Sequence, residues 1–121
     1  MIYYDSEDQE IVASADVHNV IADTIRKNSS ESTVSESPDE VRFLSIRKGH
    51  GLVTIKCTRS SVVISGSPEK LLAVASNFAW LAAQEPVPGI LSPHLHLEYA
   101  PNHPIFSADS EPLLITLANL D

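Results

Sequence analysis

Cysteine, tryptophan, basic residues and long apolar runs are all scarce in this 121-residue sequence, and most of these scarcities exclude a class of protein. A single cysteine, Cys57, cannot form an internal disulfide and favours a reducing compartment. No run approaches the about 20 apolar residues that a membrane-spanning helix needs. The N-terminus shows neither the basic segment nor the apolar stretch of a signal peptide. We therefore expect a cytoplasmic protein with no membrane association.

Acidic residues outnumber basic ones: sixteen Asp and Glu against eight Lys and Arg give a formal net charge of −8. This excess disfavours direct binding to nucleic acid. It serves solubility, or it steers the protein toward a basic partner. With 43% hydrophobic residues, the chain has enough apolar material to form one domain over residues 1–121.

Two amphipathic helices are predicted, each preceded by a short strand. The first follows a strand over residues 10–15 and begins at its N-cap, Asp16, with His18 on the helix surface. In the second, Ser67 is the N-cap and Pro68 the first helical residue. Both helices therefore have a start signal as well as an apolar stripe.

Two β-rich runs lie between the helices. They cover residues 41–48 and 52–58 and flank the turn Gly49-His50-Gly51, which predicts a β-hairpin. Residues 28–40 are rich in Ser and Glu and have almost nothing to bury, so they predict a flexible acidic loop.

The two strand–helix segments resemble each other. Residues 12–22 align with residues 63–73 at a shift of 51, and the same shift brings residues 41–48 onto the region 94–99. This suggests a duplicated β-α-β-β unit, although the periodicity of strand–helix units alone would also produce it. The expected fold class is α+β, with a single, mostly antiparallel sheet and two helices packed on one face.

The most informative stretch runs from His94 to Leu114. Alternation places His94, His96 and Glu98 on one face of a strand, and Leu and Tyr residues on the other. Two prolines and an Asp-Ser-Glu-Pro turn then lead to a closing strand over residues 113–117. The three polar side chains must face solvent, a ligand or a partner.

These residue types also fit a metal site. His94, His96 and Glu98 would suit zinc or non-haem iron, with His103 or Asp109 as a further ligand. The same spacing arises in any strand with polar residues facing outward. The sequence has no nucleophile elbow, phosphate-binding loop, paired C-x-x-C or H-E-x-x-H motif. We expect no enzymatic activity and no cofactor, and a metal- or small-ligand-binding enzyme is the alternative.

The order of motifs between about residues 60 and 117 resembles that of a known family. A strand-Gly-Ser helix start precedes H-L-H-L-E-Y-x-P-x-H-P and then D-S-E-P-L-L-I. This order is similar to that of the small immunity proteins of bacterial polymorphic toxin systems, in particular immunity protein family 32. The matching positions are His94, His96, Glu98, Pro101, His103, Asp109, Ser110, Pro112 and Leu113.

The resemblance implies a non-enzymatic protein that binds and neutralises a cognate toxin domain in the cytoplasm. Many toxin domains act on nucleic acids and present basic clefts, for which an acidic partner is suited. A phage-type inhibitor of host defence would show the same sequence features. The residues expected to contact the partner are His94, His96, Glu98, Asn102, His103, Asp109, Ser110 and Glu111.

Overall fold

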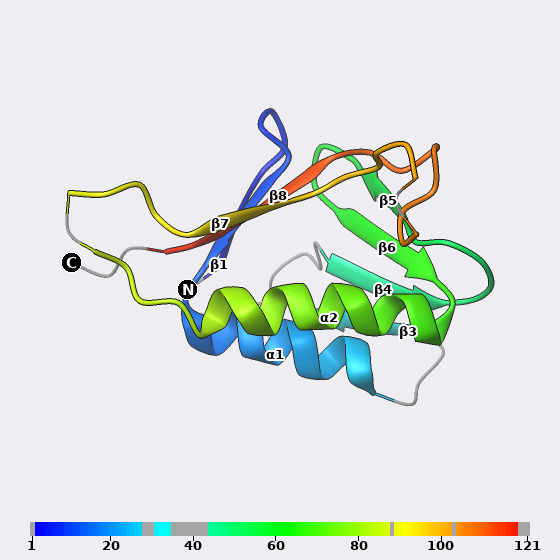
Figure 1. Cartoon of the computed structure of the whole chain (residues 1–121), viewed down its shortest axis with the longest axis horizontal. Coiled ribbons are helices and arrows are strands. Elements are labelled where there is room, and N and C mark those ends of the chain that lie inside the picture. The colour runs from blue at the N-terminus through cyan, green and yellow to red at the C-terminus, as the bar shows by residue number, and fades with distance from the viewer. Residues whose placement is uncertain (1, 28–30, 35–43, 88, 103, 119–121) are drawn as a thin grey trace.

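The computed structural model describes residues 2–27, 31–34, 44–87, 89–102 and 104–118 (Figure 1). Neither helix is long and apolar enough to cross a membrane, as far as the described residues go. The elements in chain order are β1 (Ile2–Asp5), β2 (Glu10–Ala13), α1 (Ala15–Arg26), β3 (Glu31–Val34), β4 (Leu44–Lys48), β5 (Thr54–Cys57), β6 (Val62–Gly66), α2 (Pro68–Ala82), β7 (His94–Leu97) and β8 (Leu113–Leu117).

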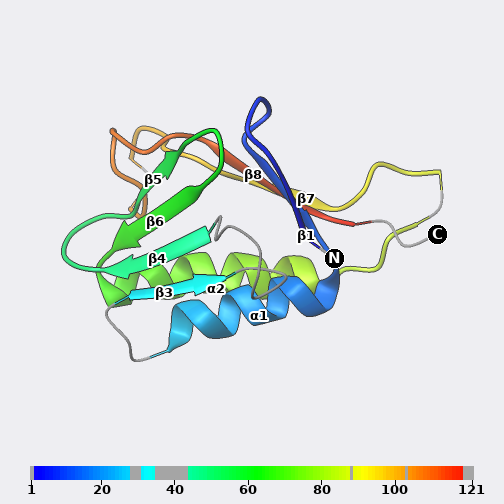
Figure 2. The ribbon, with the colours of Figure 1, turned by 180° about the vertical axis from the view of Figure 1, so that it is seen from behind.

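The strands form two four-stranded mixed sheets, so the α+β class is confirmed and the prediction of a single sheet is wrong. Sheet A has the order β1-β2-β8-β7, and sheet B has the order β3-β4-β6-β5. In each sheet the two central strands are parallel and both outer pairs are antiparallel. The two helices lie side by side beneath the sheets in both views (Figures 1 and 2).

The predicted hairpin between β4 and β5 is also wrong. Both strands exist, but β6 lies between them, parallel to β4 and antiparallel to β5. The glycine segment instead crosses the end of β6, where Gly49 N–H donates to Gly66 O at 2.8 Å and Ser67 N–H donates to Gly51 O at 3.1 Å. A Cβ on Gly66 would lie 3.0 Å from the Cα of Val53, so only glycine permits this close crossing.

The chain is built from two β-β-α-β-β units that exchange strands. Hairpin β1–β2 of the first unit pairs with hairpin β7–β8 of the second, and β3–β4 pairs with β5–β6. The suggested β-α-β-β unit therefore lacks one strand of each repeat, and its alignment also differs. The N-caps are Ser14 and Ser67, not Asp16, which places the helices at a shift of 53. The counterpart of β4 is β8, whereas residues 94–97 correspond to β3.

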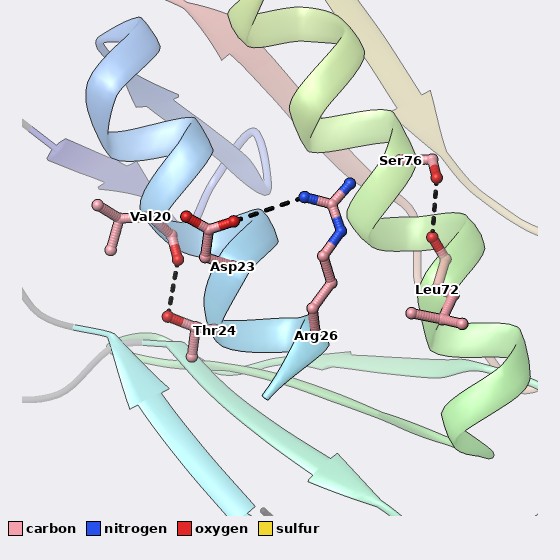
Figure 3. Close-up of polar contacts among 6 residues, drawn as sticks. All are labelled: Val20, Asp23, Thr24, Arg26, Leu72 and Ser76. Carbon is pink, nitrogen blue, oxygen red and sulfur yellow. Dashed lines mark hydrogen bonds and ion pairs between the residues drawn. The ribbon is translucent and has the colours of Figure 1, made fainter. Parts of the chain in front are cut away.

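The core lies between the two helices and the inner faces of both sheets. Buried positions recur at the shift of 53 along the helices, and the pairs are His18 and Leu71, Ile21 and Val74, Ala22 and Ala75, and Ile25 and Phe78. The polar contacts drawn in Figure 3 are local. Thr24 and Ser76 donate to carbonyls four residues earlier, and Asp23 pairs with Arg26 at 3.5 Å (Figure 3). Apolar side chains of both helices pack against those of the two sheets.

His18 lies in this core and not on the helix surface, contrary to the prediction. It is fully buried, and its ring lies 5.7 Å from that of Phe78. Its Nε2 lies 2.8 Å from Thr116 O and must donate, because a carbonyl only accepts. Burial lowers the pKa of His18, and Nδ1 has no partner among the described residues. The neutral ring is therefore the form that this site favours.

Residues 31–34 lie within the segment predicted as a flexible acidic loop and form β3. The remainder of residues 28–40 lies outside the described residues.

Candidate partner-binding face

Strand β7 forms one edge of sheet A and shows the predicted alternation. Leu97 is buried and Leu95 packs against the core, whereas His94 is half-buried and His96 is exposed. The two imidazole rings lie 5.5 Å apart in an edge-to-face arrangement. His94 Nδ1 donates to Ser92 O at 2.9 Å, which fixes the orientation of this ring.

The strand register shows which side chains share the face of these histidines. Ile11, Ala13, Ile115 and Leu117 are buried, so the residues that alternate with them point away from the core. They form two rows across sheet A, one of Asp5, Glu10, Leu114 and His96 and the other of Tyr3, Val12, Thr116 and His94. We call these eight residues the outer face of sheet A.

The outer face contains an open hollow of about 380 Å³. Leu114 and Thr116 line it together with both histidines, and Leu91 adds an apolar side chain that is 79% exposed. Thr116 Oγ1 donates to Glu10 Oε2 at 2.6 Å, so a carboxylate is held in place at the hollow. A polar anchor and apolar walls are the usual composition of a binding surface.

The segment between β7 and β8 leaves sheet A and reaches β5, an edge strand of sheet B. We call residues 105–111 the strap. The backbone of Val53 exchanges hydrogen bonds with Ile105 O at 2.8 Å and Ser107 N–H at 2.9 Å. Ile55 O accepts from Glu111 N–H at 2.8 Å. The strap therefore covers the β5 edge as an additional strand would.

Two predicted partner residues complete this cover with their side chains. Ser110 Oγ accepts from Ile55 N–H, and Glu111 Oε2 accepts from Cys57 N–H, both at 2.9 Å. Asp109 is exposed, and its carbonyl accepts from Lys56 Nζ at 3.0 Å. The structure thus separates residues 109–111 from the histidines, and their contact with a partner stays a prediction.

Glu98 and Asn102 lie in the segment between the two groups. Glu98 follows β7 and is exposed. Asn102 is also exposed and has a φ of 69°, as expected for a tight turn. His103 lies outside the described residues.

Cys57 lies where the strap, β5 and β1 meet. Burial, followed by the charge of Glu111, raises the pKa of the Cys57 thiol. Burial and the neighbouring Cys57 raise the pKa of Tyr4 to about 12, and the Tyr4 hydroxyl donates to Thr58 O at 2.9 Å. The thiol therefore stays protonated near neutral pH and is a weak nucleophile.

Sequence reasoning missed Tyr3, Glu10 and Thr116 as members of the outer face. Alternation in β2 indicates that Glu10 points away from the core, but only strand pairing brings it to the histidines.

Among the described residues, no group of three or more His, Cys, Asp and Glu could hold a metal ion.

The described residues define a small α+β protein with an open, mixed polar and apolar sheet face. Residues 61–118 match the model of the family described as Immunity protein 32. This match confirms the resemblance found in the same part of the sequence. No curated protein and no solved structure matches the chain.

Proposed function

We propose that this chain is a non-enzymatic immunity protein that binds a cognate toxin domain in the cytoplasm and blocks its active surface. The observation that supports this function is the match of residues 61–118 to the immunity protein 32 family. The net charge of −8 suits a toxin whose active surface is basic.

The binding site that we propose begins at β7. His94 and His96 project from an edge strand onto the outer face of sheet A, and Glu98 extends the same end of the strand. Tyr3, on the opposite edge strand, is 56% exposed. Exposed aromatic and imidazole side chains on a rigid sheet are suited to recognition of another protein.

Coexpression tests the function. The chain should restore growth to cells that express the toxin encoded beside it, and the two proteins should co-purify. A toxin that remains lethal and does not co-purify with the folded chain would contradict the immunity role.

A double variant tests the site. His96→Ala with Glu98→Ala should weaken toxin binding about tenfold or more, because two exposed contacts are lost. The circular dichroism spectrum should not change, because both side chains are exposed. Arg59→Ala with Glu69→Ala provides a matched control, since both residues are exposed and lie outside sheet A. Full protection by the His96 and Glu98 variant would exclude this site and leave the immunity role in place.

A further inference from the structure

The strands of the two sheets differ in charge. Those of sheet A contain Asp5 and Glu10 and no Lys or Arg, and those of sheet B contain Arg47, Lys48 and Lys56 with one acidic residue, Glu31. The chain segments around them show the same bias. Residues 1–25 and 71–121 contain every strand of sheet A and have eleven Asp and Glu but no Lys or Arg. Residues 26–70 contain every strand of sheet B, all eight Lys and Arg and five Asp and Glu. With neutral histidines, the first set has a net charge of −11 and the second has +3. The sheets lie on different sides of the molecule in both views (Figures 1 and 2).

The hollow on the outer face of sheet A has the features that a long cationic side chain requires. Leu91 and Leu114 offer apolar surface to an aliphatic stem, as long charged side chains prefer. The Glu10 carboxylate, held by Thr116 Oγ1 at 2.6 Å, offers a charged acceptor to the head group. The other residues of both rows include no Lys or Arg that would compete for this carboxylate.

We propose that the outer face of sheet A docks a toxin segment that presents arginine or lysine, with one cationic side chain in the hollow beside Glu10. The toxin as partner rests on the proposed function, and the cationic chemistry rests on the charges and geometry of this face. A second copy of the chain is a poor occupant, since a symmetric contact would bring two acidic faces together. Nucleic acid is repelled for the same reason.

A tetra-arginine peptide is a probe of this chemistry that does not involve the toxin. Titration of the ¹⁵N-labelled full chain should shift the amide signals of Glu10, His94, His96 and Thr116. Signals from sheet B should stay in place, and a tetra-glutamate peptide should cause no shifts.

Two substitutions at exposed His96 test whether the positive charge of the peptide drives its binding. His96→Glu should tighten peptide binding about threefold and His96→Lys should weaken it about threefold, as expected for exposed charge pairs. Equal weakening by both variants would show that charge does not govern peptide binding at this face and would overturn the proposal. Shifts confined to sheet B or the strap would also overturn it. Either result would leave the coexpression test of toxin neutralisation unaffected, so the two proposals fail separately.

Discussion

At position 18, α1 has an imidazole where the equivalent position of α2 has Leu71. The two sites share a buried environment, but only His18 can donate a hydrogen bond, and it does so to Thr116 O. This bond joins α1 to β8, the strand that also provides Leu114 and Thr116 to the outer face. A protonated ring would leave a charged N–H at Nδ1 with no partner among the described residues.

His18 should therefore make stability dependent on pH. Burial lowers the pKa of His18 below the unfolded value of about 6.5, so the unfolded chain binds more protons at mildly acidic pH. Stability should be full above about pH 6.5 and fall as the pH decreases, with a slope of at most about 1.4 kcal/mol per pH unit from this group.

Urea unfolding of wild type and His18→Leu at pH 7.5 and pH 5.5 measures this contribution. The variant should lose less stability than wild type between the two values. An equal loss in both proteins would show that His18 does not titrate on unfolding in this range.

At the scale of elements, the strap takes the place that a further strand would have beside β5. Its backbone and the side chains of Ser110 and Glu111 bond to β5 at the edge of sheet B. An exposed edge invites association with other chains, and the strap prevents this. The motif D-S-E-P thus has a structural role beside any role in binding.

Removal of the Ser110 hydroxyl tests how much the strap contributes to the stability of the protein. Ser110→Ala leaves Ile55 N–H without its acceptor, and should reduce the free energy of unfolding by about 1–3 kcal/mol. Ser107→Ala is the matched control, since its hydroxyl contacts only the Thr54 hydroxyl, at 2.8 Å, among the bonds described for it. Urea unfolding and amide exchange at Ile55 measure both effects. Unchanged exchange at Ile55 in Ser110→Ala would contradict the role of the strap.

Elements were predictable where local rules determine them. The Ser67 cap, the apolar stripe of α2, the alternation in β7 and the closing strand β8 all follow from nearby residues. Strand pairing was not predictable in the same way. The glycine segment after β4 resembles a hairpin turn, but β4 and β5 do not pair with each other. Strand β6 lies between them and pairs with both. Glu10 and Thr116 are 106 residues apart, and no local pattern connects them.

In the whole molecule, exchange of hairpins between the two units places the first strand, β1, and the last strand, β8, in the same sheet. Sheet A is thus built from strands that contain Asp5 and Glu10 and no Lys or Arg, whereas Arg47, Lys48 and Lys56 lie in strands of sheet B. An outer face with two carboxylates and a more basic sheet B follow from one topology. Such asymmetry orients an approaching basic protein and accelerates association at low ionic strength.

Amide hydrogen exchange of the chain, alone and in complex with its toxin, tests most directly which surface binds. The outer face of sheet A is predicted to be the site, so exchange should slow in the edge strands β1 and β7 and around Leu91, and remain unchanged in sheet B. Slower exchange confined to β5 and the strap, with β1 and β7 unaffected, would contradict the account.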